Sequence, residues 1–278
     1  MKTVTPRSSI SGAILLAKFE LKKILFSTRG LVALAAFALV WFLILWYPVK
    51  HASVYLFSPD FKQLLSALFG ESSVSELFSW KVAEMAILWV AALYLFPLFS
   101  IFVSADQFAS DKTRGTFRFL TLRANRDTLF FGRVAGYLFI QAILLAFTLF
   151  ATLLLIAYRD PNLLPSAVGS LLFIFVNIMI VLLPYTALMA ILSLYANSAR
   201  QATIYAILLL AGISIVNGII NYYLPSLSAV LQWIVPGAQL SMMINTHGFS
   251  SLPIAAIPLI QAAVLLLLGR TYMARIAI

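Results

Sequence analysis

The segment from Ser110 to Arg133 combines charged and aromatic side chains in a way that neither a buried core nor an ordinary solvated loop requires. It reads SDKTRGTFRFLTLRANRDTLFFGR, carries six basic residues and lies between two long apolar runs. Its large apolar side chains are Phe117, Phe119, Leu120, Leu122, Leu129, Phe130 and Phe131. Aromatic side chains that fill a pocket, with arginines at the rim, are typical of a protein-docking surface. The alternative is a basic loop whose aromatic side chains rest in the lipid interface.

Polar side chains within or beside the apolar runs indicate a second kind of site. They are Glu84, Gln141, Asn177, Asn217, Asn221 and Gln261. Because intramembrane polar groups usually face the protein interior, these residues could line a substrate path between two subunits. The alternative for each amide is a hydrogen bond between helices. For Glu84 the alternative is an interfacial carboxylate that pairs with Lys81 or solvent.

Residues for catalysis or metal binding do not come together in this sequence. His51 and His247 are its two histidines, both fall outside the apolar runs, and there is no cysteine. We therefore expect no catalytic group, no metal site and no cofactor in this chain. An intramembrane enzyme would need a catalytic pair that the sequence does not supply.

The elements that must position these residues are transmembrane helices. Of the 278 residues, 63% are hydrophobic and 10% are charged, whereas a soluble domain is about 45–50% apolar and about 25% charged. A bilayer core requires about 20 apolar residues in a helix. Six such runs predict an all-α integral membrane protein with one transmembrane domain over residues 1–278 and spans at about 31–48, 82–104, 134–158, 167–196, 202–224 and 252–269.

The basic residues predict the orientation of these spans. If the N-terminus lies inside, fifteen of the 19 Lys and Arg residues fall on the inner side, and the other four are Lys50, Lys62, Lys81 and Arg159. Because cytoplasmic loops carry the excess of Lys and Arg, we expect both termini and the 105–133 loop in the cytoplasm and the 225–251 loop outside, in an inner (cytoplasmic) membrane. The charge brackets the spans and is not gathered on a polar domain, so we expect no nucleic-acid partner.

Local signals predict how the segments outside the spans are built. Residues 1–30 predict a cytoplasmic or interfacial helix, with Glu20, Lys22 and Lys23 within it; the alternative is an extension of the first span. A capping box at residues 73–76 predicts that the second helix begins near Val74 and runs to about Ser110. Gly115 would end that helix. Asn125 would cap the third helix, with Asp127 in its first turn.

The sequence FASDKTRGTFRFLTLRANRDTLFFGR resembles the cytoplasmic loop of permeases of ABC-2 type exporters, half-transporters with the type V ABC transporter fold. The loops of that family commonly have acidic, basic, Gly-Thr, apolar and arginine positions in this order. The residues that occupy the same order here are Asp111, Arg114, Gly115, Thr116, Phe117, Leu120, Arg126 and Gly132-Arg133. Arg114 stands where an acid is frequent, no proline precedes Arg126, and Arg133 replaces a lysine. The segment AKFELKKILFSTRG, with Glu20, is similar to the family's interfacial helix. WIVPG at 233–237 is similar to its extracellular hairpin before the last span.

The resemblance implies that the 105–133 loop carries a coupling helix seated in a groove of a separate ABC ATPase. The coupling residues would be Asp111, Arg114, Gly115, Thr116, Phe117, Arg118, Phe119, Leu120 and Arg126. Phe117 and Phe119 would be the buried anchors, and Arg114, Arg118 and Arg126 the charged rim. The sequence contains no G-x-x-x-x-G-K-[ST] pattern, so ATP and Mg would bind in the partner.

The resemblance further implies a second permease subunit in the lipid bilayer, as a homodimer that forms an export path. The alternative is a non-transporting membrane sensor or assembly-factor subunit that docks an ATPase through the same loop.

Overall fold

The computed structural model describes residues 9–51, 63, 66–67, 80–223, 233–244, 246 and 252–275. Every regular element among these residues is a helix. Six helical segments are long and apolar enough to span a membrane: Gly30–Val49, Ala83–Thr113, Arg126–Arg159, Pro161–Tyr195, Ala199–Tyr223 and Pro253–Arg275. Each overlaps one predicted span, which confirms an all-α membrane protein with six spans.

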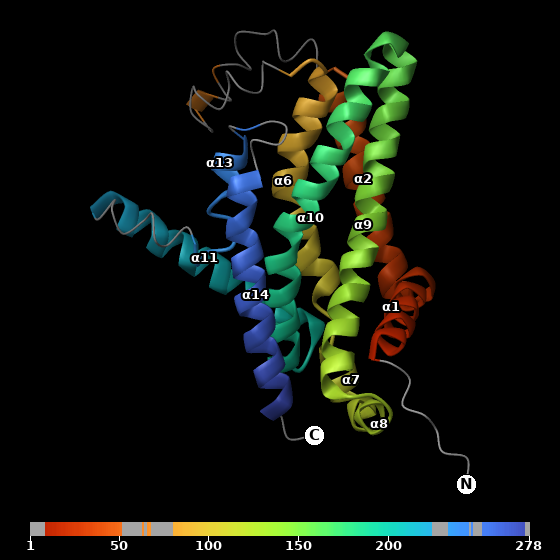
Figure 1. Cartoon of the computed structure of the whole chain (residues 1–278), viewed down its shortest axis with the longest axis vertical. Helices are drawn as coiled ribbons and strands as arrows, with labels where there is room; N and C mark the ends of the chain where they lie inside the picture. The colour runs from red at the N-terminus through yellow and green to blue at the C-terminus, as the bar shows by residue number, and fades with distance from the viewer. Residues whose placement is uncertain are drawn as a thin grey trace.

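The helices form a bundle around α10 (Leu164–Tyr195), which packs against α6 (Ala83–Ser104), α9 (Arg126–Arg159), α11 (Ala199–Tyr223) and α14 (Leu252–Arg275). Figure 1 shows α6, α9, α10 and α14 running side by side. The remaining elements are α1 (Ser9–Phe26), α2 (Thr28–Ile44), the π-helical turn η1 (Leu45–Val49), α7 (Ala109–Thr113), α8 (Thr116–Arg123), the 3-10 turn η2 (Pro161–Leu163) and α13 (Leu240–Ile244).

The central place of α10 follows from its composition, because its apolar residues are not confined to one face. Its buried side chains include Ile174, Ile178 and Val181, and a helix that is apolar all round is buried by neighbours on several sides. Trp89 of α6 lies against Phe173, with 5.1 Å between the ring centroids. The bundle core is therefore built from large side chains of α6, α9 and α10.

Helix α11 leaves the bundle, and the chain turns at residues 196–198 to allow this. The Ser198 hydroxyl accepts a hydrogen bond from the Gln201 N–H (3.2 Å), and the Gln201 side-chain oxygen accepts one from the Asn197 N–H (3.0 Å). These two bonds form a variant of the capping box, in which the Gln201 side chain reaches Asn197 and not the N-cap residue Ser198, and they stabilise a new helix start. In Figure 1, α11 points away from the other helices, and Ala202 and Ala206 are its buried residues.

The prediction of one helix from Val74 to Ser110 is wrong in the part that the structure describes. Helix α6 begins only at Ala83, after an extended Val82; Val74 itself lies outside the described residues. The helix ends at Ser104. The Asp106 carboxylate then accepts the Ser110 backbone N–H (3.1 Å) in the first turn of a separate helix, α7. The prediction for α9 is confirmed in position: Asn125 is its N-cap residue and Asp127 lies in its first turn, although the Asn125 side chain makes no capping bond.

Candidate functional site

Residues 105–133, which we call the elbow, comprise the short helices α7 and α8, the turns around them and the first residues of α9, at the end of the bundle where α7 and α8 lie (Figure 1). Gly115 separates α7 from α8 and has a φ of +69°. A Cβ on Gly115 would meet nothing within 4 Å, so glycine is favoured here by its backbone conformation and not by lack of space. The Thr116 hydroxyl closes the turn by donating to the Asp111 carboxylate (3.0 Å) and to the Asp111 carbonyl (3.2 Å).

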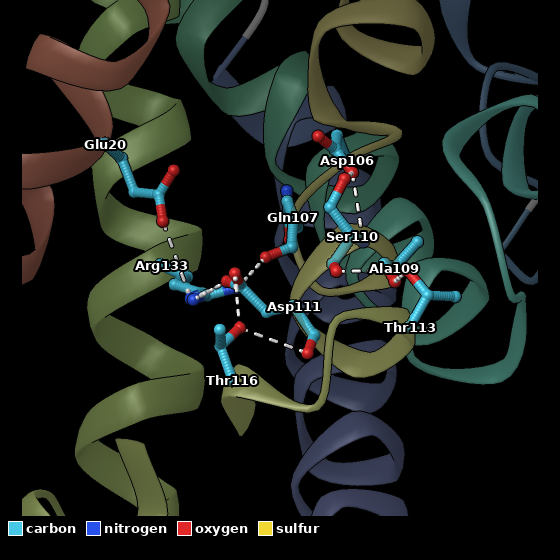
Figure 2. Close-up of polar contacts among 9 residues, drawn as sticks. All are labelled: Glu20, Asp106, Gln107, Ala109, Ser110, Asp111, Thr113, Thr116 and Arg133. Atoms are coloured by element: carbon cyan, nitrogen blue, oxygen red, sulfur yellow. Dashed lines mark hydrogen bonds and ion pairs between the residues drawn. The ribbon is translucent and has the colours of Figure 1, made fainter. Parts of the chain in front are cut away.

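The elbow is held to the rest of the protein by Arg133, whose side chain is only 1% exposed. Figure 2 shows its guanidinium between two carboxylates, with Asp111 of α7 on one side and Glu20 of α1 on the other. It donates hydrogen bonds to the Asp111 carboxylate and to the Gln107 carbonyl, and its Nε lies 3.5 Å from Glu20 Oε1. Since Glu20 is fully buried, this cation helps to compensate the charge of a carboxylate inside the protein.

Helix α1 reaches Arg133 because it packs closely on α9. A Cβ on Gly136 would lie 3.0 Å from the Ala17 Cα and 3.4 Å from the Glu20 Cβ. The missing side chain at Gly136 therefore lets the backbones approach until Glu20 faces Arg133, one helical turn away from Gly136. Lys22 is exposed, and the Lys23 side chain lies outside the described part of the chain.

Two other elbow cations bind the ends of spanning helices. Lys112 Nζ donates to the carbonyls of Leu194 (3.2 Å) and Tyr195 (3.0 Å) at the end of α10. Arg126 donates to the carbonyls of Met273 (3.2 Å) and Ala274 (2.7 Å) at the end of α14. Cations at these positions satisfy carbonyls that have no partner within the helix. Arg126, which was predicted for the charged rim of the docking surface, is thus half-buried and bound to the end of α14.

The two aromatic side chains predicted as docking anchors point in different directions. Phe117 is 5% exposed and belongs to a cluster with Phe108, Phe130, Leu194 and Met273. Phe119 is 70% exposed and Leu122 is 83% exposed. Leu120 is partly buried against the cluster, whereas Arg114 and Arg118 are exposed. Helix α8 therefore packs on the bundle through one face and presents the other face, with Phe119, Leu122 and Arg118, to its surroundings.

The polar residues of the spans do not form one lining. Gln141 donates to Ser100 (3.0 Å), Ser104 (3.1 Å) and Thr186 (3.2 Å), so it joins α6, α9 and α10 as the hydrogen-bonding alternative expects. Asn177 donates to the Phe173 carbonyl of its own helix (3.0 Å).

Three further residues of this set lie elsewhere. Gln261 donates to the Val235 carbonyl (3.0 Å). Asn217 lines a cavity, whereas Asn221 is exposed.

Glu84 pairs with a residue that sequence reasoning did not connect to it. Its carboxylate is 1% exposed and lies 2.6 Å from Arg159 Nη1, at the opposite end of the bundle from the elbow. The expected partner of an interfacial carboxylate was Lys81 or solvent. The signal that could have identified Arg159 was its place as the last residue of a spanning helix, on the same side of the membrane as Glu84.

The comparisons with known proteins agree with this architecture. The family described as "ABC-2 family transporter protein" matches residues 14–269, which include most of α1, the elbow, the first five spans and the last span as far as Gly269. A search of curated proteins found no match to the sequence. Because the family match covers most of the chain and the structure supplies six spanning helices, this chain belongs to the ABC-2 transporter family and is a membrane-embedded permease component of an ABC transporter.

Proposed function

We propose that this chain is the membrane-spanning permease subunit of an ATP-driven exporter, works as a homodimer and is powered by a separate ABC ATPase that docks on the elbow. ATP and Mg would bind in that partner. The observation that carries the proposal is the division of α8 into two faces. One face is fixed to the bundle through Phe117, and the other leaves Phe119 and Leu122 at 70% and 83% exposure.

The contacts of the elbow give a route by which docking could act on the spans. A force on α8 would pass through Lys112 to the end of α10, through Arg126 to the end of α14 and through Arg133 to α1. Because three separate hydrogen-bonded or ionic contacts tie the elbow to three helices, its displacement would rearrange the bundle and not only the loop.

The docking proposal predicts that a Phe119→Ala/Leu122→Ala variant loses the ATPase. A buried interface anchor cut to alanine typically costs about 2 kcal/mol of binding or more, or roughly 30-fold in Kd. We expect the tagged wild-type chain, purified from its native membrane, to bring down an ABC ATPase identified by mass spectrometry. The double variant should fold and yet bring down little of it.

Two controls separate docking from general effects of surface change. Phe26→Ala removes an aromatic side chain that is 82% exposed on α1 and should leave the ATPase bound. Arg118→Ala removes an exposed charge, so the ATPase should be retained better than in the double variant, with binding that weakens as salt rises. Full recovery of the ATPase by the Phe119→Ala/Leu122→Ala variant would show that α8 is not the docking element.

The orientation of the chain also belongs to this proposal, with both termini and the elbow in the cytoplasm of a cell whose inner membrane holds the protein. The sequence has no cysteine, so in a single-cysteine variant a thiol reagent can label only the introduced residue. Cysteine at Asn162, exposed between α9 and α10, should react in intact cells with an impermeant maleimide, and cysteine at the exposed Arg114 should react only after permeabilisation. Labelling of the Arg114→Cys variant in intact cells would reverse the proposed orientation.

A further inference from the structure

A cavity of about 340 Å³ lies between α6, α10, α11 and the segment 235–240. Pockets for small ligands have volumes of about 300–1,000 Å³, so this cavity is large enough for a small molecule or for part of a lipid. A second cavity, beside the junction of α1 and α2, has about half this volume, 180 Å³. The larger cavity is the more informative one because part of its wall is not helical.

That wall is formed by residues 235–238, which are non-helical although they lie at the depth of the spanning helices. The Val235 carbonyl accepts a hydrogen bond from Gln261 (3.0 Å), about two and a half turns inside α14. Gly237 lies against the Tyr185 hydroxyl, in the interior of α10. At membrane depth, irregular backbone is tolerated only where it is buried in protein or lines a water-filled cavity. The segment 235–238 lines the cavity described above.

The lining of the cavity is polar in places but carries no charge. Tyr94, Tyr185, Ser214 and Asn217 bring hydroxyl and amide groups, and apolar side chains such as Pro97 and Leu98 form much of the rest. The sequence has no acidic residue after Asp160. A charged ligand would therefore lose its hydration in this cavity without meeting an opposite charge, which is strongly unfavourable.

Hydrogen-bonding capacity is left over at this place. The Asn217 Oδ1 atom is buried and accepts no hydrogen bond from the described residues. Gln239, which follows the cavity-lining Ala238, is completely buried, and neither of its amide atoms has a hydrogen-bond partner in the described part of the chain. Buried polar groups are normally satisfied, so an unsatisfied acceptor at a cavity wall indicates a donor that comes from a ligand or from water.

We infer that this cavity binds an uncharged amphipathic molecule, with an apolar body against α6 and a hydroxyl or N–H that donates to Asn217 Oδ1. The claim that this molecule is the transported cargo rests on the proposed transport function, whereas the claim that the cavity binds it does not. Two sources supply the chemistry: a neutral lipid of the bilayer or a dissolved amphiphile.

The test is native mass spectrometry of the full purified chain with matched probes. Dioleoylglycerol and dioleoylphosphatidic acid have the same acyl chains and differ in charge; 1-dodecanol and dodecanoate at pH 8 form the second such pair. We expect the neutral member of at least one pair to bind, and Asn217→Leu to weaken it about fivefold or more through loss of a hydrogen bond. If only the binding of dioleoylglycerol depends on Asn217, the ligand is a lipid. If only the binding of dodecanol depends on Asn217, the ligand is a dissolved amphiphile.

The chain supplies a matched control and a second variant. Asn221→Leu makes the same substitution one turn along α11 at an exposed position and should leave binding unchanged. Leu98→Trp adds bulk to the cavity wall at a side chain that is 53% exposed and should weaken both neutral probes. Equal binding of neutral probes by the wild type and the Asn217→Leu variant, or equally Asn217-dependent binding of the anionic probes, would overturn the inference. Binding is measured without the ATPase, so failure of docking at α8 is a separate outcome.

Discussion

Arg133→Met is expected to destabilise the protein by about 3–5 kcal/mol, the usual cost of removing one partner from a buried ion pair. The variant leaves the fully buried Glu20 carboxylate without the guanidinium that lies 3.5 Å away, and it removes the hydrogen bonds to Asp111 and Gln107. Since a whole protein is stable by only about 5–15 kcal/mol, we expect a marked fall in the melting temperature of the purified chain, followed by tryptophan fluorescence.

A second substitution distinguishes loss of the guanidinium beside the Glu20 carboxylate from loss of packing. If the buried carboxylate causes the damage, Glu20→Met in the Arg133→Met background should restore much of the lost stability, because replacing both members of a buried pair by apolar groups is often neutral.

The melting temperature of Arg133→Lys should lie between those of wild type and Arg133→Met, since an ammonium group cannot reproduce the guanidinium fork. Lysine is the residue that is frequent at this position in the loops that this segment resembles. Arg118→Met makes the same change at an exposed position and should melt like wild type. Unchanged melting of Arg133→Met would remove Arg133 from the framework of the elbow.

The six spans could be predicted because each depends on a continuous apolar run, which is a local property. The same holds for the position of Asn125, which is decided within a few residues of chain. Gly115 was predicted to end the helix from Val74, whereas it separates α7 from α8. The division of α8 could not be predicted in this way. Phe117 and Phe119 have the same chemistry and are two residues apart, and what separates them is the packing of Leu194 and Met273, from α10 and α14, against one face only.

Ionic partners were unpredictable for a related reason. Glu20 was singled out because its segment is similar to the family's interfacial helix, but its pairing with Arg133 depends on the close approach of α1 and α9 at Gly136. The Glu84–Arg159 contact likewise depends on the ends of two helices meeting in space. In both cases the local sequence indicates the charge, and only the tertiary structure indicates which opposite charge lies beside it.

Gly237→Ala is expected to lower the stability of the protein by an amount comparable to that of Arg133→Met, for two reasons that can be separated. Gly237 has a φ of +94°, and holding a residue with a side chain in such a sparsely populated region costs about 1–3 kcal/mol. In addition, the new Cβ would overlap the Tyr185 hydroxyl, whereas the next atom, Tyr185 Cζ, would be 3.6 Å away in ordinary contact. We therefore expect a strong loss of thermal stability in Gly237→Ala alone.

Tyr185→Phe removes only the hydroxyl, so it should relieve the overlap and leave the backbone strain. The Gly237→Ala/Tyr185→Phe variant should then melt between Gly237→Ala and wild type, and the two changes should be clearly non-additive, as expected for residues in contact. Gly169→Ala is the matched control, because a Cβ there meets nothing within 4 Å and the residue lies in α10, where alanine favours the helix by up to about 1 kcal/mol. Additive effects of Gly237→Ala and Tyr185→Phe would mean that the segment 233–240 does not lie against α10. The wall of the proposed ligand cavity would then be lost with it.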